Sequence, residues 1–236
     1  MHGLFGSGKN WNSVGNALKD LGDVYLLDAR NHGDSFHASS HSLADMADDL
    51  REFIHAMAIE NPVLVGHSMG GMAVMLYALL YAEQEMSLVV VDIFPKNHDY
   101  DFKNEMEALS VDPAAYASRK EIDQAMARFV PDAFIRQFLQ MNLERTPEGK
   151  YQWKINLPAI AGRNKLFDVH FTRPVAFAGK TAFIMGENSP YYKPEEEQLA
   201  RQYFPHAKIH VVSGGGHYIH YTHFQQFVEI VRSEIS

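Results

Sequence analysis

Residues 62–71 read PVLVGHSMGG, an apolar run that passes directly into the pattern Gly-x-Ser-x-Gly. The residues that follow, to about Ala82, are rich in alanine, methionine and leucine and predict a helix. A tight turn between a buried strand and a helix exposes the serine at its tip, and the flanking glycines leave room for both elements. The stretch therefore predicts a nucleophilic Ser68 rather than a glycine-rich turn with an ordinary surface serine.

The pattern on either side of this turn alternates between short apolar runs and amphipathic stretches. Strands are expected at residues 24–27, 62–65, 88–91, 181–185 and 209–212, and helices at 10–21, 43–57, 69–82, 194–204 and 222–235. The run at 24–27 is bounded by turn residues and predicts a strand that is buried on both faces. Alternation of this kind predicts an α/β fold, with a mostly parallel central sheet covered by helices on both faces.

Residues 96–173 differ from the rest of the chain. Helical stretches at 102–109, 122–129 and 133–143 replace the strands, and residues 151–155 form the one alternating piece. We therefore expect a helical cap, or lid, at 96–173. It would be inserted between a first core part at 1–95 and a second at 174–236.

Length and composition narrow the class of protein. The chain has 236 residues, 46% of them hydrophobic and 21% charged, as is usual for a globular domain. A net charge of −8 disfavours nucleic acids and anionic membranes as partners, and no apolar run approaches the ~20 residues of a membrane-spanning helix. The absence of cysteine excludes disulfides and thiol nucleophiles. The first residues lack the features of a signal peptide, which predicts a cytoplasmic protein.

A serine hydroxyl needs an adjacent base, and His217 is the candidate. It follows the last predicted strand through a glycine-rich loop, which can reach back over the sheet edge that carries Ser68. His217, His220 and His223 are spaced three apart, as metal ligands on one helix face would be. The glycines at 214–216 place His217 in a loop instead, and we expect no metal site.

The base needs an orienting acid, for which the sequence offers three candidates. Asp92 ends the strand that follows the nucleophile helix and neighbours the strand of Ser68. Ser189 lies in the loop after residues 181–185, but a serine cannot hold an imidazolium by charge. Glu187 in the same loop is a weaker third choice. We favour Asp92, with Ser189 as a hydrogen-bonding helper.

Backbone N–H groups near Ser68 are candidates for an oxyanion hole. The turn at His2-Gly3 can present the N–H of Leu4, and the N–H of Met69 follows the nucleophile. A glycine-rich chain start is the alternative reading of that turn. Apolar side chains are candidates for lining an acyl pocket or, alternatively, for packing within the cap: Phe5, Phe94, Phe134, Phe138, Met141 and Trp153.

Six motifs appear in order along the chain: HGLFGS (2–7), DARNHGDS (28–35), GHSMGG (66–71), VDIFP (91–95), GENSPY (186–191) and GGHYIH (215–220). Together they resemble the α/β-hydrolase superfamily, and most closely the bacterial YbfF-type esterases. The resemblance extends over nearly the whole chain, cap included. It implies hydrolysis of short-chain acyl esters, or of acyl-CoA thioesters, by Ser68 and His217. It also implies Asp92 as the acid, with Ser189 close by. The serine mechanism expected here needs no cofactor.

The sequence departs from this family at its start. Relatives have further strands before the His-Gly turn, and the nearest of them should lie between the strands at 24–27 and 63–65. Without it, buried backbone groups would be unpaired. Three explanations are open: residues missing from the sequence, a strand exchanged with a partner chain, or a sheet that pairs around the gap. We favour the first.

The sequence as a whole predicts a serine carboxylesterase that forms an acyl-enzyme. A thioesterase and a carbon–carbon bond hydrolase with the same triad are alternatives, as is a non-catalytic ligand-binding protein of the same fold. A dehalogenase is disfavoured, because it would need a carboxylate at position 68. The expected partner is a small acyl ester or thioester, and the expected state is a monomer or homodimer.

Overall fold

A computed structural model describes residues 1–81, 85–98, 101–161, 166 and 176–235 of the chain. Its main sheet has four parallel strands in the order β1, β2, β5, β6. Their bounds are Val63–His67 for β1, Ser87–Val91 for β2, Lys180–Gly186 for β5 and Lys208–Val212 for β6. The strands predicted at 62–65, 88–91, 181–185 and 209–212 are confirmed.

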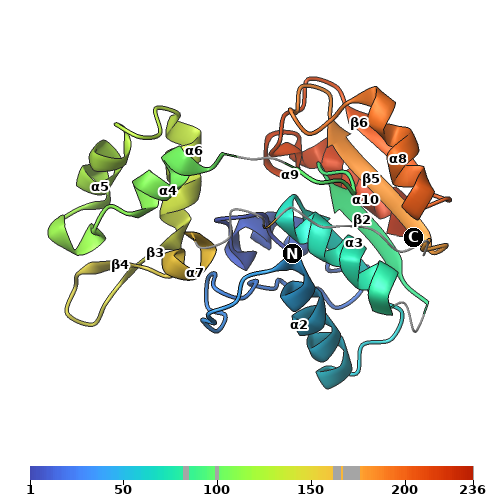
Figure 1. Cartoon of the computed structure of the whole chain (residues 1–236), viewed down its shortest axis with the longest axis horizontal. Helices are drawn as coiled ribbons and strands as arrows, with labels where there is room; N and C mark the ends of the chain where they lie inside the picture. The colour runs from blue at the N-terminus through green and yellow to red at the C-terminus, as the bar shows by residue number, and fades with distance from the viewer. Residues whose placement is uncertain (82–84, 99–100, 162–165, 167–175, 236) are drawn as a thin grey trace.

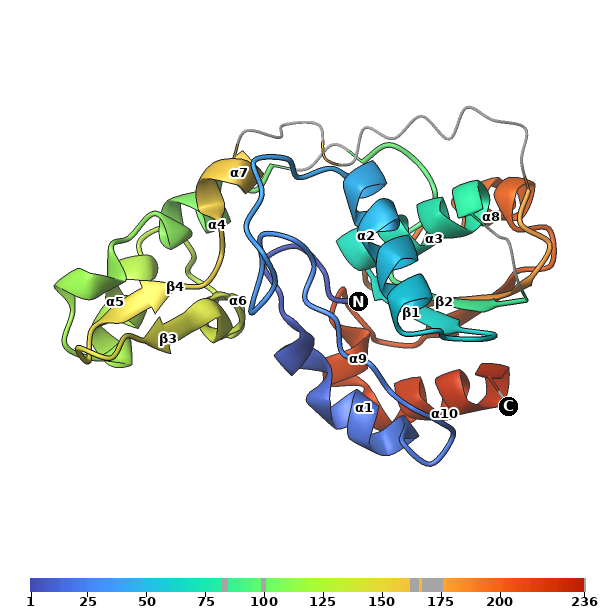
Figure 2. The same cartoon turned by 90° about the horizontal axis from the view of Figure 1, so that it is seen from below.

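Helices cover both faces of this sheet (Figures 1 and 2). One face carries α2 (Leu43–Ala56), α3 (Met69–Tyr81) and α8 (Glu197–Tyr203), the last after a 3-10 turn at Pro194–Glu196. The other carries α1 (Asn12–Leu18), after a 3-10 turn at Gly8–Trp11, with α9 (Ile219–Thr222) and α10 (Phe224–Ile235). In the described part of the chain no helix is long and apolar enough to cross a membrane.

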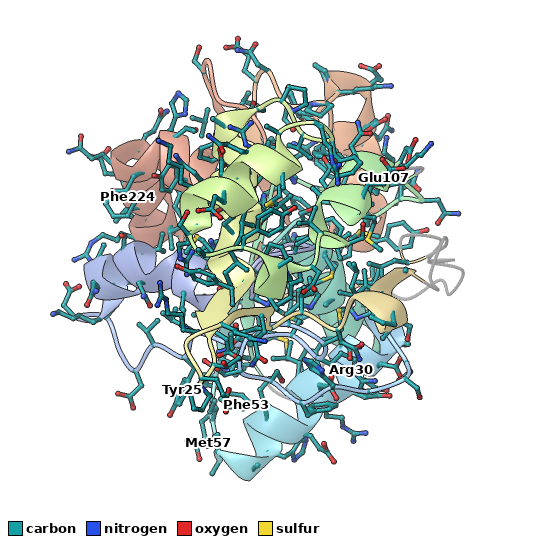
Figure 3. The ribbon with its side chains drawn as sticks, turned by 90° about the vertical axis from the view of Figure 1, so that its left-hand side faces the viewer. Tyr25, Arg30, Phe53, Met57, Glu107 and Phe224 are labelled. Carbon is teal, nitrogen blue, oxygen red and sulfur yellow. The ribbon has the colours of Figure 1, made fainter. Side chains whose placement is uncertain are left out.

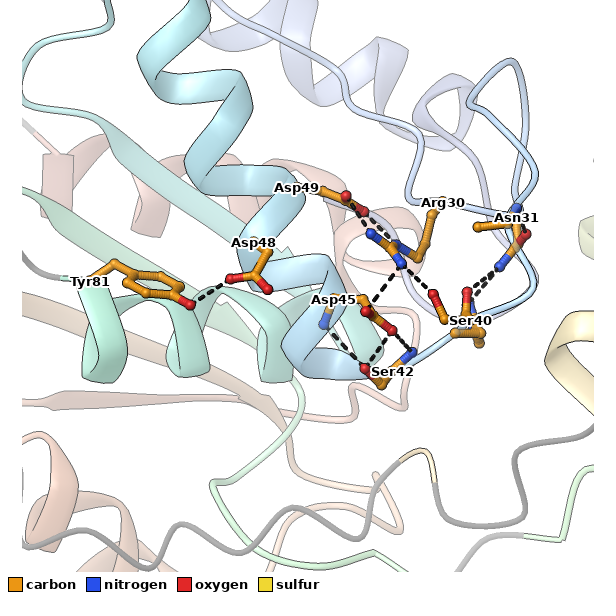
Figure 4. A network of polar contacts seen from close by, with 10 residues as sticks. Arg30, Asn31, Ser40, Ser42, Asp45, Asp48, Asp49 and Tyr81 are labelled. Atoms are coloured by element: carbon orange, nitrogen blue, oxygen red, sulfur yellow. Dashed lines mark hydrogen bonds and ion pairs between the residues drawn. The ribbon is translucent and has the colours of Figure 1, made fainter.

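The loop before α2 is tied to that helix by a polar network (Figure 4). Ser42 caps α2: its hydroxyl accepts from the N–H of Asp45, whose carboxylate accepts from the N–H of Ser42. Arg30 donates from Nε and Nη2 to the two carboxylate oxygens of Asp49, at 2.6 and 2.5 Å. The network holds Arg30, and with it the backbone of the 28–35 stretch, against α2.

The prediction of a buried strand at 24–27 is wrong. The segment is irregular, and Val24, Tyr25 and Leu26 are 38–42% exposed. Tyr25 packs edge-on against Phe53 of α2 with ring centroids 5.4 Å apart, close to Met57 (Figure 3). The physical reason is the lack of a ladder partner: β1 is the last strand of the sheet on this side, and a hollow of about 580 Å³ separates it from the segment.

A lobe of helices and a small hairpin lies between β2 and β5 in sequence and to one side of the sheet in space (Figures 1 and 2). We call its described residues, 96–98 and 101–161, the inserted segment. Its helices are α4 (Lys103–Leu109), α5 (Arg119–Met126), α6 (Ala133–Leu139) and α7 (Leu157–Ala161), with 3-10 turns at Pro113–Ala115 and Gln140–Asn142.

The alternating piece predicted at 151–155 is confirmed as β4 (Tyr151–Trp153). Its antiparallel partner β3 (Leu143–Arg145) was not predicted, because three residues directly after a helix carry no readable alternation. The predicted boundary between residues 173 and 174 lies outside the described residues.

His220 is packed into the core between the sheet and α10. Its ring stacks on Trp11 with centroids 4.6 Å apart and an interplanar angle of 4°, and it lies edge-on to Phe227. Only 6% of the residue is exposed. Burial, aided by the neighbouring His217, lowers the pKa of His220 from 6.5 to about 3. The ring is therefore neutral in the folded protein at pH values at which it is charged in the unfolded chain.

Replacing His220 by phenylalanine is expected to make the fold less sensitive to acid. Between pH 6.5 and about 3, His220 binds a proton in the unfolded chain but not in the folded protein. The contribution of neutral His220 to the free energy of unfolding is therefore complete above pH 6.5 and is lost as the pH falls toward 3. The loss in free energy of unfolding from pH 7.5 to 5.0 should be about 2 kcal/mol smaller in His220→Phe than in the wild type. Urea unfolding at both pH values measures it, with the exposed His206→Gln as control. An equal loss in both proteins would contradict the assignment.

Candidate active site

Ser68 lies between β1 and α3, at the carboxyl edge of the sheet. Its φ is 50°, in the left-handed region, which costs a non-glycine residue about 1–2 kcal/mol. The turn is tight, because a Cβ on Gly66 would lie 2.3 Å from the carbonyl oxygen of Gly70. The N–H of Ser68 donates to the carbonyl of Val91 at 3.0 Å and fixes the turn to β2. The predicted strand–turn–helix arrangement is therefore present.

Asp92 directly follows β2 and is fully buried. Its φ is 54°, and its N–H donates to the carbonyl of Ile184 at 2.9 Å. Oδ1 of its carboxylate accepts from the N–H of Gly186 at 2.7 Å, and Oδ2 accepts from the hydroxyl of Ser189. Nδ1 of His217 lies 2.7 Å from the same Oδ2. Two of these donors come from the end of β5 and the loop after it, the third comes from the loop after β6, and all three meet at this one carboxylate.

The contact with Asp92 determines the tautomer of His217. A buried carboxylate accepts hydrogen bonds, so the proton of the neutral imidazole lies on Nδ1. The lone pair then lies on Nε2, which makes this nitrogen a proton acceptor. Of the three acid candidates, Asp92 is the one that contacts His217. Glu187 instead accepts from the hydroxyl of Ser213 and the N–H of Gly214, both at 2.8 Å, and so holds the turn that precedes His217.

His67 packs beside His217, with ring centroids 4.5 Å apart. Its Nε2 lies 2.8 Å from the carbonyl oxygen of His217, which can only accept, so this nitrogen carries the proton. Burial, followed by the neighbouring His217 and His220, lowers the pKa of His67 well below its usual range. A neutral donor therefore fixes the backbone of His217 without placing a second positive charge beside it.

Two tyrosines that the sequence analysis did not single out flank His217. The ring of Tyr191 lies 4.2 Å from the imidazole and that of Tyr218 5.2 Å. Burial raises the pKa of Tyr218. Both tyrosines could have been found from the sequence. Tyr191 ends the GENSPY motif two residues after Ser189, and Tyr218 directly follows His217 in the GGHYIH motif.

The turn Gly3–Gly6 lies against Ser68. A Cβ added to Gly3 would sit 3.3 Å from Cβ of Ser68 and 2.8 Å from Nδ1 of His67. The N–H of Gly6 closes the turn on the carbonyl of Gly3 at 2.9 Å, and Phe5 takes its third position with a φ of 61°. This is the type II geometry, which normally calls for glycine at the third position. The turn carries Leu4 at its second position.

Two buried histidines hold this turn. The sequence analysis placed His2 in the turn but gave its side chain no role, and it did not single out His32. Nδ1 of His2 donates to the carbonyl of Gly3 at 2.8 Å, while its Nε2 accepts from the N–H of Ala29 at 3.0 Å. Nε2 of His32 accepts from the N–H of Phe5 at 3.2 Å. Burial lowers the pKa of His32 to about 4 and that of His2 well below its usual range, so both remain acceptors at neutral pH.

The predicted pocket residues are dispersed. Phe5 contacts Phe102, with ring centroids 5.7 Å apart, and Phe94 is fully buried against Phe183. The indole N–H of Trp153 donates to the carbonyl of Val111 inside the inserted segment.

Two other predicted pocket residues lie beside Tyr218, which flanks His217. Phe134 and Phe138 of α6 contact the ring of Tyr218 at 5.2 and 5.3 Å. Met141 is 41% exposed, and its sulfur lies 2.7 Å from the amide nitrogen of Asn10. The structure thus brings α6 of the inserted segment beside Tyr218, on the side of His217 that this tyrosine covers.

The three histidines spaced three apart do not converge on one point. His217 contacts Asp92, and His220 stacks on Trp11. No group of three or more His, Asp or Glu side chains among the residues described here has the arrangement of a metal site.

Comparisons with known proteins identify the family of the chain. Residues 1–230 match the alpha/beta hydrolase family. The chain is 36% identical over 242 residues to the mouse sn-1-specific diacylglycerol lipase ABHD11, covering 99% of this chain and 78% of the lipase. It is 30% identical over 222 residues to esterase YbfF of Escherichia coli K12, covering 93% and 85%.

A solved structure has nearly the same backbone. A marine microorganism esterase superposes with a TM-score of 0.94 at 36% identity, over 99% of this chain and 93% of the esterase. The match to the family extends through the inserted segment to α10, so it covers every strand and helix described above except the last turn of α10. From its sequence and its fold, the chain belongs to the alpha/beta hydrolase family.

Proposed function

We propose that this chain is a serine carboxylesterase in which Ser68, His217 and Asp92 form the catalytic triad. One observation carries the proposal: the buried carboxylate of Asp92 contacts Nδ1 of His217 at the sheet edge that also holds Ser68. Relatives named as esterases and a lipase support hydrolysis of carboxylic esters. Short acyl chains as the preferred substrates are part of the proposal.

The chemistry follows from the tautomer of His217. Its Nε2 takes the proton of Ser68 as Oγ bonds to the carbonyl carbon, and the carbonyl electron pair moves onto the oxygen. The resulting imidazolium is stabilised by the Asp92 carboxylate. When the tetrahedral intermediate collapses, the ester bond breaks and His217 protonates the departing alcohol. Water then repeats the two steps on the acyl-enzyme and frees Ser68.

The negative oxygen of the intermediate is proposed to accept hydrogen bonds from the N–H groups of Leu4 and Met69. The position of the Gly3–Gly6 turn against Ser68 supports Leu4, and the start of α3 directly after Ser68 supports Met69. Donors of this kind contribute about 3 kcal/mol each to lowering the barrier, because they are already oriented when charge develops.

The inserted segment is proposed to act as the cap that shapes the acyl site. The contacts of Phe134 and Phe138 with Tyr218 support this, because they bring an apolar face of the segment beside His217. The cap boundaries at 96 and 173, the cytoplasmic location and the monomeric or dimeric state remain predictions from the sequence.

Replacing Ser68 by alanine is expected to lower the hydrolysis of p-nitrophenyl acetate by a factor on the order of 10⁴ or more, because no nucleophile is left for His217 to activate. Release of p-nitrophenol measures turnover, and circular dichroism confirms that the variant is folded. A folded Ser68→Ala protein with the turnover of the wild type would refute the mechanism.

Asp92, which contacts His217, and Ser189, which contacts Asp92, are expected to differ in their effect on catalysis. Asp92→Asn should cost a factor of about 10⁴ in kcat, because an amide can pair with the wrong tautomer of His217 and carries no charge. Ser189→Ala should cost about tenfold, because Asp92 keeps its charge and its bond from Gly186. Steady-state kinetics on the same ester compares them. The reverse ranking would transfer the acid role to the Ser189 loop.

A further inference from the structure

Asn142 links the inserted segment to the turn beside Ser68. It ends the 3-10 turn after α6 and is 1% exposed. Its Nδ2 donates to the carbonyl of Phe5 at 2.7 Å and to the carbonyl of Leu139, inside the inserted segment, at 3.1 Å. The first bond joins residues 137 positions apart and ends within the Gly3–Gly6 turn.

Phe5 is held at both of its backbone polar groups by side chains. Its N–H donates to His32 and its carbonyl accepts from Asn142. A φ of 61° is unfavourable for a phenylalanine, so the turn depends on outside contacts to keep this conformation. His32 supplies one contact from the hydrolase core, and Asn142 supplies the other from the inserted segment.

The bond from Asn142 reaches Leu4 through two rigid peptide units. The carbonyl of Phe5 and the N–H of Gly6 belong to one planar peptide, so fixing the carbonyl fixes the direction of that N–H. The N–H of Gly6 donates to the carbonyl of Gly3, which shares its own peptide plane with the N–H of Leu4. The bond from Asn142 therefore acts together with the bond from Nδ1 of His2 to the Gly3 carbonyl in fixing the peptide plane that carries the Leu4 N–H.

We propose that Asn142 is a positioning residue, supplied by the inserted segment, that holds the Leu4 N–H in the direction required to bind the reacting oxygen. The proposal rests on the serine esterase function given above. It makes the inserted segment part of the catalytic geometry and not solely a cover for the acyl site.

Gln140 provides a matched control. It is a second buried amide in the same 3-10 turn, and its Nε2 donates to Asp123 of α5 at 2.9 Å, within the inserted segment. Asn142→Leu and Gln140→Leu each replace a buried amide by an apolar side chain of similar size. Of the two, only the first removes a bond to the Gly3–Gly6 turn.

The probe is an alkyl trifluoromethyl ketone with a ¹³C-labelled carbonyl. Oγ of Ser68 bonds to the carbonyl carbon, the carbonyl electron pair moves onto the oxygen, and the serine proton passes to His217. The ¹³C shift of the resulting hemiketal reports the pKa of its oxygen, which is lowest when the oxyanion donors are well placed. Ester kinetics and the thermal midpoint are measured on the same three proteins.

Asn142→Leu is expected to lower kcat about 10- to 100-fold with KM changed less than about threefold, and to raise the hemiketal pKa by about one unit or more. Gln140→Leu should keep the hemiketal pKa and kcat of the wild type. Asn142→Ala is the second variant, and should shift the hemiketal pKa in the same direction as Asn142→Leu.

Other outcomes overturn the proposal. One is a folded Asn142→Leu protein with the hemiketal pKa of the wild type. The other is a loss of activity that is proportional to the drop in thermal midpoint in the Asn142 and Gln140 variants alike, because the role of Asn142 is then structural. A wild-type protein that forms no hemiketal and hydrolyses no ester would instead overturn the proposed esterase function itself.

Discussion

The buried carboxylate of Asp92 is the interaction on which the rest of the site depends. An ionised carboxylate at full burial is costly unless it is paired, and here a backbone N–H, a hydroxyl and an imidazole all point at it. The parallel register makes this possible: Val91 at the end of β2 pairs with Ile184 of β5 and with His67 of β1. The carboxyl ends of three strands therefore deliver Ser68, Asp92 and the Ser189 loop to one edge.

The parts of the site that sequence analysis predicted are those encoded locally. The apolar run, glycines and helix around Ser68 lie within twenty residues, and each carries its own pattern. Asp92 could be ranked above Glu187 because strand order placed it beside Ser68. The prediction of a strand at 24–27 failed for the opposite reason: an apolar run is typical of a buried strand but does not supply its ladder partner. His32 and Asn142 could not be found this way, since their contacts with Phe5 join distant segments.

Two residues of the site have strained backbones that neighbouring hydrogen bonds hold in place. Ser68 and Phe5 both adopt left-handed backbone conformations, each costing about 1–2 kcal/mol. The net contribution of one hydrogen bond to stability is about 0.5–1.5 kcal/mol. The two hydrogen bonds from His32 and Asn142 to the backbone of Phe5 are therefore of the size needed to offset its strain. Burial keeps His2, His32 and His67 neutral, so these supports carry no charge that would compete with the Asp92–His217 pair.

Asp92 and His217 together should make Ser68 a reactive nucleophile. Intact-mass measurement after treatment with a fluorophosphonate, followed by peptide mapping, detects such a serine. We expect one adduct per chain, located on Ser68, that forms far more slowly when Asp92 is replaced by asparagine. No adduct on the wild-type protein, or an adduct on another residue, would contradict it.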